Sequence, residues 1–118
     1  MNAESSEGPR GSKEKTSELF PTLEVKPGSG FAGHTQPYVE IRDFHQGVGR
    51  IIKAAMLENR MDHPAYKLKK EAGAFLQGDQ ENWLLIEFWK PDPKDYMPFV
   101  EYLNGKIAEL RNEEMLEK

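Results

Sequence analysis

Three histidines are the residues of this chain best suited to acid–base or metal chemistry. His34, His45 and His63 stand 11 and 18 positions apart, so they form no His-x₃-His pair that would place two imidazoles on one helix face. Asp43 lies two residues before His45, and the two side chains could serve acid–base chemistry if they lined a cleft. Helix capping explains Asp43 without a functional role. The chain contains no cysteine, which excludes a thiolate nucleophile and a cysteine-based metal site. The sequence therefore predicts no metal site, no cofactor and no assembled catalytic group.

The turn around position 47 is the best candidate for a ligand site. Gly47 and Gly49 follow a predicted strand and lie where a predicted helix opens, a setting in which backbone amides can approach an anion. The basic side chains in this turn are those of Arg42, His45 and Arg50. Neither glycine-rich nucleotide motif has its full spacing here, and close packing of the helix on the sheet explains the glycines equally well. We take these five residues as a candidate site for a small anionic ligand or a nucleotide.

A second group of basic residues follows between positions 60 and 70. Lys67, Lys69 and Lys70 lie within four positions, and Asp62 and Glu71 flank them. Short runs of mixed charge are common on solvated helix faces, which is one interpretation. The alternative is that Lys67, Lys69 and Lys70 add to the anion site, contributed by a neighbouring subunit.

The distribution of charge argues against a general nucleic-acid-binding protein. The chain has 16 basic and 20 acidic side chains, and residues 92–118 carry seven acidic against four basic groups. Binding to DNA or RNA draws most of its affinity from basic groups that neutralise phosphates. No apolar run reaches the roughly 18–20 residues that a membrane span needs, and the first residues lack the apolar core of a secretory signal. We expect a soluble, cytoplasmic protein that binds neither nucleic acid nor a membrane.

Composition divides the 118 residues into three parts. Residues 1–17 contain no apolar run and are predicted to form a disordered tail. Residues 18–37 are predicted to be an extended segment and a glycine-rich loop, and the apolar residues of the segment either dock on the domain or form a linear motif that folds on a partner. Residues 38–118 are predicted to form a single α+β domain.

The first strand and helix of this domain are predicted from their periodicity. Apolar and polar residues alternate over 38–42, as in a half-buried strand. Helical spacing of apolar residues predicts a helix over about Phe44–Arg60, with Asp43 as its N-cap and Gln46 completing a capping box. The two glycines of the turn oppose a helix, so the start moves toward Arg50 if they are excluded.

The next segments are predicted to be a short helix and a hairpin. A proline at the start and a glycine after the end favour a helix over 64–72, with a strand over part of this range as the alternative. The residues Ala74–Leu76 and Asn82–Trp89 are predicted to pair around a four-residue loop, Gly78–Glu81.

The last element is a long amphipathic helix. Apolar residues recur at helical spacing over Tyr96–Met115, and Asp95 is predicted to be the N-cap, which leaves Pro98 in the first turn. The order of elements predicts the α+β class: a small sheet of three to four strands packed against two or three helices.

The strand over Trp83–Trp89 is apolar on both of its faces. One face carries Leu84, Ile86 and Phe88. The other face carries Trp83, Leu85 and Trp89. If helices cover one side of the sheet, the tryptophan side is left as an apolar patch of the kind that marks a partner or self-association surface. The alternative is that the N-terminal segment or the long helix covers it.

Trp83, Leu85 and Trp89 are therefore the candidate interface residues. Together with the lack of a catalytic group, they predict a small non-enzymatic binding or regulatory protein that acts through protein contact and forms a homo-oligomer, most simply a homodimer. The alternative function is the binding of a small anionic ligand or nucleotide at the Arg42–Arg50 turn with the Lys67–Lys70 cluster.

Overall fold

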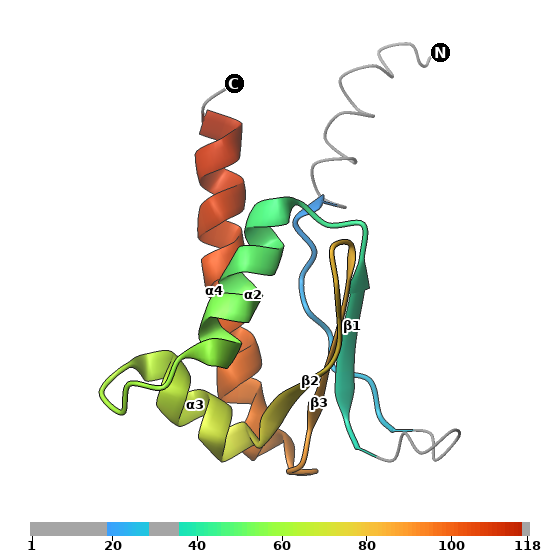
Figure 1. Ribbon diagram of the computed structural model, residues 1–118, viewed down its shortest axis with the longest axis vertical. Coiled ribbons are helices and arrows are strands. Elements are labelled where there is room, and N and C mark those ends of the chain that lie inside the picture. Colours follow the sequence, from blue (N-terminus) through green and yellow to red (C-terminus); the bar gives the residue numbers. More distant parts are fainter. Residues whose placement is uncertain (1–18, 29–35, 117–118) are drawn as a thin grey trace.

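The computed structural model describes residues 19–28 and 36–116 of the chain. Within these ranges the elements are β1 (Tyr38–Arg42), α2 (Gln46–Leu57), α3 (Pro64–Ala72), β2 (Ala74–Gln80), β3 (Trp83–Phe88) and α4 (Pro93–Leu116). Three helices and a three-stranded antiparallel sheet confirm the predicted α+β class (Figure 1). The tail predicted to be disordered and most of the predicted glycine-rich loop lie outside the described residues.

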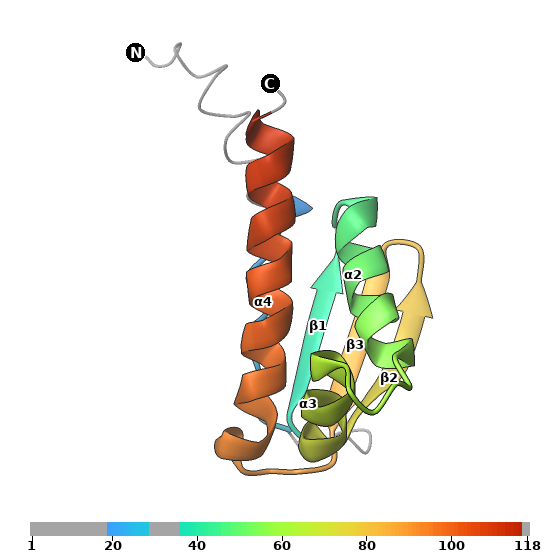
Figure 2. The same ribbon diagram turned by 90° about the vertical axis from the view of Figure 1, so that its left-hand side faces the viewer.

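The sheet has the strand order β1-β3-β2, so β3 is its central strand. The register places Ile41 of β1 opposite Leu84 and Val39 opposite Ile86. All three helices lie on one side of the sheet (Figures 1 and 2), and we call this side its inner face. Strand β3 is buried on the inner face at Leu84, Ile86 and Phe88. A strand with neighbours on both edges and helices over one face explains the long apolar run of β3.

The helices complete the hydrophobic core against that inner face. The buried residues of α2 and α4 in the core are Val48, Ile52, Ala55, Tyr96, Phe99, Val100, Leu103 and Ile107. They recur at helical spacing, which confirms the amphipathic pattern predicted for both helices. Among the described residues, no helix combines the length and the apolar character that a membrane crossing requires.

The segment 19–28 docks on the domain, which was the first of the two predicted alternatives. Phe20 and Leu23 are buried in the core. The backbone of Leu23 forms two hydrogen bonds with the side chain of Asn104 on α4, at 2.7 and 3.2 Å. Lys26 and Tyr38 exchange two backbone hydrogen bonds, so the segment also closes the edge of β1 at its start. The segment therefore joins α4 to the edge of the sheet.

The prediction that Asp43 caps α2 is wrong. The N-cap is His45, whose Nδ1 accepts a hydrogen bond from the amide of Gly47 at 2.9 Å. Asp43 has a φ of 57°, a left-handed conformation that Asp tolerates better than most residues. Its backbone amide donates to the carbonyl of Asn82 at 2.9 Å. Asp43 thus reverses the chain after β1 and ties it to the hairpin turn, and the helix begins at Gln46.

The hairpin connection is shorter than predicted. The residues Gly78–Gln80 belong to β2 rather than to a loop, and two residues, Glu81 and Asn82, connect β2 to β3. A bulge between Leu76 and Gly78 shifts the register of β2. Gly78 stands in the strand because the ring of Trp83 lies where a side chain at position 78 would be.

The predicted start of α4 is also wrong. The helix begins at Pro93. The side chain that caps its first turn is that of Asp92 rather than Asp95, because Asp92 Oδ1 accepts a hydrogen bond from the backbone amide of Lys94 at 3.0 Å. Proline is favoured at the first helical position because its nitrogen carries no hydrogen that would need a partner. Pro98 consequently lies in the second turn, and the helix continues through it.

Helix α3 confirms the short helix predicted over 64–72. His63 is its N-cap and Gly73, with a φ of 64°, is its left-handed C-cap. The helix also supplies a cap to α2, because Lys69 Nζ donates to the carbonyl oxygens of Met56 and Glu58, both at 2.8 Å. A lysine predicted as part of a basic cluster is therefore a structural group that joins two helices.

Replacing Lys69 with methionine is expected to lower the free energy of unfolding by about 1–2 kcal/mol, because two carbonyls at the end of α2 lose a charged donor. Lys70→Met is the matched control, because Lys70 is exposed on the same helix and lies over the same Tyr66 ring. Its effect should stay within about 0.5 kcal/mol. Urea denaturation followed by circular dichroism compares the two variants, and equal losses would show that the cap contributes nothing.

Candidate functional site

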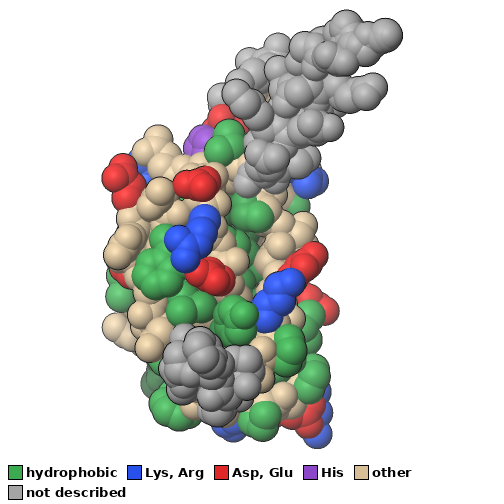
Figure 3. Space-filling view, turned by 90° about the vertical axis from the view of Figure 1, so that its right-hand side faces the viewer, with side chains coloured by type: hydrophobic (Ala, Val, Ile, Leu, Met, Phe, Trp, Pro, Cys, Tyr) green, Lys and Arg blue, Asp and Glu red, His purple; other side chains and the backbone are tan. Residues whose placement is uncertain are grey.

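The side of the sheet opposite the helices is the first candidate site, and we call it the outer face. Residues opposite one another in register share a face, so the pairings assign the members of this surface. They are Tyr38, Glu40, Arg42, Phe75, Gly78, Gln80, Trp83, Leu85 and Glu87. Trp89 follows β3 on the same side and stacks on Phe75. Figure 3 shows hydrophobic side chains gathered on this side of the molecule, with a few charged groups among them.

Trp83 is held rigidly on the outer face. Its Nε1 donates a hydrogen bond to Glu40 Oε2 at 2.6 Å, and Arg42 Nη2 donates to the same oxygen at 2.8 Å. The guanidinium of Arg42 lies 5.3 Å from the centre of the indole, a cation–π distance. The ring rests on Gly78. An aromatic side chain fixed in this way loses little conformational entropy when it contacts a partner.

A second aromatic pair lies farther along the same face. Phe75 and Trp89 stack with ring centres 5.2 Å apart, and Trp89 is 63% exposed. The amide of Trp89 donates to the carbonyl of Gly73 at 2.9 Å, which fixes the backbone below the ring. Trp89 is therefore a large apolar side chain that faces solvent from a well-defined position.

The middle of the outer face is buried within the chain. Leu85 is 7% exposed and Glu87 is 5% exposed. Of the three predicted interface residues, Trp89 is thus exposed, Trp83 is half-buried and Leu85 is buried. The surface accessible to a partner consists of the aromatic groups around Leu85 rather than Leu85 itself.

The predicted anion site is not assembled by the fold. Arg42 points to the outer face, while His45 caps α2 and stacks on Phe20. The amide of Gly47 is already bonded to His45, and a Cβ at that position would lie 2.6 Å from Leu110 of α4. These observations support packing and capping, rather than contact with an anion, as the reason for the turn's composition.

The remaining members of that predicted site also lie apart. A Cβ at Gly49 would lie 3.1 Å from the ring of Phe44, so this glycine permits close packing. Arg50 is exposed on α2, and Lys67 and Lys70 are exposed on α3. The start of α2 and the whole of α3 lie at opposite ends of the domain (Figure 1). Within one chain these basic side chains do not converge.

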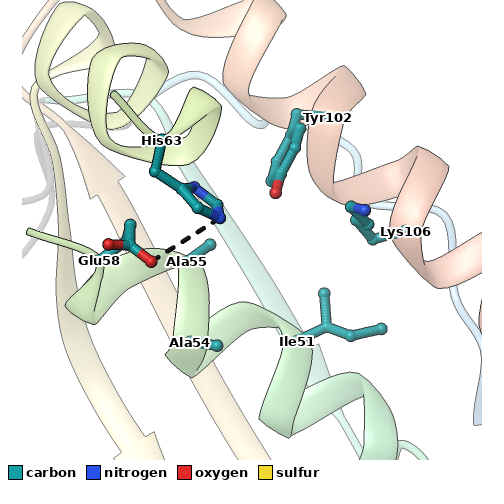
Figure 4. A pocket seen from close by; sticks show the side chains of 7 residues that line it. All are labelled: Ile51, Ala54, Ala55, Glu58, His63, Tyr102 and Lys106. Carbon is teal, nitrogen blue, oxygen red and sulfur yellow. Dashed lines mark ion pairs between the residues drawn. The ribbon is translucent and has the colours of Figure 1, made fainter. Parts of the chain in front are cut away.

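A pocket on the helical side is a second candidate site, and we call it the helical pocket. It has a volume of about 200 Å³ and is lined by Ile51, Ala54, Ala55, Glu58, His63, Tyr102 and Lys106 (Figure 4). Among these residues, the sequence indicated His63 as a histidine suited to acid–base or metal chemistry, but it predicted no pocket at this place. The available signal was the spacing of Tyr102 and Lys106, four positions apart and so on one helix face. Their convergence with residues of the α2–α3 turn depends on how the helices pack.

The chemistry of the helical pocket centres on a histidine and a glutamate. His63 Nε2 lies 3.7 Å from Glu58 Oε2, and His63 Nδ1 accepts a hydrogen bond from the amide of Ala65 at 3.1 Å. Glu58 Oε1 accepts hydrogen bonds from the amide and the Nε of Arg60, at 2.9 and 3.1 Å. These bonds, the backbone one first, hold the pKa of Glu58 below its ordinary value. Glu58 is therefore ionised and already partnered near neutral pH.

Metal binding finds no support in the part of the chain that the structure describes. Over residues 19–28 and 36–116 no three histidine, aspartate or glutamate side chains are grouped so that they could hold a metal ion together. His45 Nε2 approaches Glu114 Oε1 at 4.0 Å, which makes a pair rather than a group of three.

No protein-family model matches this chain, and comparisons with curated proteins and with solved structures find no significant match. Function is therefore inferred from the outer face and the helical pocket themselves.

Proposed function

We propose that the protein is a small non-enzymatic binding protein that acts through protein contact, and that the outer face of its sheet joins it to a second copy of the chain. The observation that carries the proposal is Trp89, 63% exposed and stacked on Phe75 on the side of the sheet opposite the helices. Exposed aromatic groups at fixed positions on a sheet face are typical of contact surfaces.

The positions of the two tryptophans support a contact at both ends of the outer face. Trp83 lies at one end of β3 and Trp89 lies just beyond the other end, with buried Leu85 between them. A rigid tryptophan buries a large area at a small entropic cost when a partner covers it. Two such anchors, one at each end, define both the position and the orientation of a partner.

The charges on the outer face favour a second copy as that partner. A two-fold interface brings a surface against itself, so the surface must be complementary to itself in charge. Glu40 and Arg42 lie two positions apart on β1, with their side chains 35% and 64% exposed. The two side chains are bonded to each other and together carry no net charge, so a second copy of the same surface meets no net repulsion. A strongly acidic or strongly basic partner would gain nothing from such a balanced pair.

Replacing Trp89 with glutamate is expected to convert the dimer into a folded monomer, because the substitution places a charge in the apolar contact. Light scattering after size exclusion measures the mass, which should fall from twice 13.5 kDa to 13.5 kDa, while circular dichroism verifies the fold. Leu57→Glu is the matched control, because Leu57 is 71% exposed and lies on α2, on the helical side. This variant should remain dimeric.

Two results would contradict the proposed function. A wild-type protein with the monomer mass at high micromolar concentration would exclude self-association. Dissociation by Leu57→Glu with Trp89→Glu still dimeric would move the interface to the helical side.

A further inference from the structure

The helical pocket opens between the end of α2, the turn that leads to α3, and the middle of α4 (Figure 4). Its volume of about 200 Å³ is below the range of about 300–1,000 Å³ for sites that take drug-sized molecules. Ala54 and Ala55 provide the space, because any larger side chain at these positions would fill it. The pocket therefore suits a small ligand, and it lies on the opposite side of the sheet from the outer face.

Apolar surface forms one wall of the helical pocket. This wall consists of Ile51, Ala54 and Ala55, all on α2. Such a wall offers a hydrocarbon body the favourable exchange of water for apolar contact. A fully polar ion would gain nothing from it, so the ligand carries an apolar part.

The opposite wall presents hydrogen-bond donors. His63 Nδ1 accepts from the amide of Ala65, so the neutral ring carries its proton on Nε2, the atom nearer the pocket and Glu58. The hydroxyl of Tyr102 points into the space, and the ammonium of Lys106 lies beside it, 5.7 Å from the centre of the Tyr102 ring (Figure 4). Imidazole, phenol and ammonium are three donors around one small volume.

Lys106 provides the uncompensated charge of this wall. The carboxylate of the pocket, Glu58, is already bonded to Arg60 at 2.9 and 3.1 Å. Over the described ranges no carboxylate lies within ion-pair distance of Lys106. An anionic group of a ligand would form the ion pair that Lys106 lacks within the described residues.

We propose that the helical pocket binds a small organic monocarboxylate. The carboxylate pairs with Lys106 and accepts hydrogen bonds from Tyr102 and His63, and the hydrocarbon body lies against Ala54 and Ala55. Inorganic phosphate lacks the apolar body, and a neutral alcohol lacks the charge, so both should bind more weakly than the carboxylate. This ligand site is independent of the proposed self-association, because the two surfaces lie on opposite sides of the sheet.

Benzoate is the probe, titrated into the full-length protein and followed by amide chemical shifts. We expect saturable shifts at residues around the pocket, such as Ala55 and Tyr102. Benzyl alcohol and inorganic phosphate at the same concentrations should give much smaller shifts. A benzoate response that is absent, or that maps to the outer face, would overturn the proposal, as would an equal response to benzyl alcohol.

Two exposed positions allow the pocket to be altered without changing the core. Lys106→Gln should weaken benzoate binding about tenfold or more, because a charge-assisted contact is lost. Lys94→Gln, at an exposed lysine in the first turn of α4, is the matched control and should leave the affinity unchanged. Ala54→Leu should abolish binding by filling the space. Unchanged affinity in Lys106→Gln would overturn the role of the lysine, and unchanged affinity in Ala54→Leu would place benzoate elsewhere.

Discussion

Replacing Phe88 with alanine is expected to lower the free energy of unfolding by about 3–5 kcal/mol, the usual cost of truncating a buried aromatic side chain. Phe88 is fully buried on the inner face of β3, and its ring stacks on Tyr96 of α4 with centres 5.2 Å apart. The substitution therefore leaves a cavity where the sheet meets the long helix. A domain of this size has a total stability of about 5–15 kcal/mol, so the variant should be close to unfolding.

Urea denaturation followed by circular dichroism measures this loss. Trp89→Ala is the control, because Trp89 is the next residue but is mostly exposed. Its truncation should lower the free energy of unfolding by about 1 kcal/mol or less when the wild-type protein and the variant are compared as monomers. Phe88→Leu keeps the comparison measurable if the alanine variant does not fold, because it removes less volume. Equal losses at positions 88 and 89 would contradict the assignment of the two residues to opposite faces.

Replacing Gly78 with alanine is the second large effect, with an expected loss of about 1–3 kcal/mol from overpacking. A Cβ at this position would lie 2.5 Å from Cζ3 of Trp83 and closer still to its Cη2. The indole cannot move aside freely, because Glu40 holds its nitrogen at 2.6 Å and Arg42 lies over the ring. The added methyl group therefore forces the ring out of a site that other interactions define.

A double-mutant cycle separates this clash from any general effect of the substitution. In the background of Trp83→Ala the ring is absent, and Gly78→Ala should be neutral or stabilising, because glycine weakens a strand relative to alanine. The four proteins are compared by urea denaturation. An equal cost of Gly78→Ala in both backgrounds would show that the tryptophan does not rest on this glycine.

Local patterns in the sequence determined most of the elements of this fold. The alternation over Tyr38–Arg42 predicted β1, and a proline and a glycine at the ends of Pro64–Ala72 predicted α3, as the structure confirms. The same alternation placed Trp83 and Phe88 on opposite faces of one strand. These features depend on interactions between residues close in the chain, so a short stretch of sequence contains the information.

Tertiary contacts decided the points at which those local patterns were wrong. Asp43 has the residue type of a helix cap, but a hydrogen bond to Asn82, distant in sequence, holds it in a chain reversal and leaves the cap to His45. Gly78 has the residue type of a turn, but the ring of Trp83 lies over it and keeps it in the strand. Propensity indicates what a residue can do, and the partner that packs against it selects among these uses.

The candidate sites also depend partly on local sequence pattern and partly on tertiary packing. The sequence by itself determined that Trp83 and Trp89 share one face of β3, because side chains alternate along any strand. Which face the helices cover, and that Leu85 is buried while Trp89 is exposed, follow from how the elements pack. The helical pocket depends on tertiary structure altogether: His63 and Lys106 are 43 positions apart, and the packing of α4 against both α2 and α3 brings them to one volume. A pocket between helices has no local signal, because each helix contributes side chains that look like ordinary surface until the other is in place.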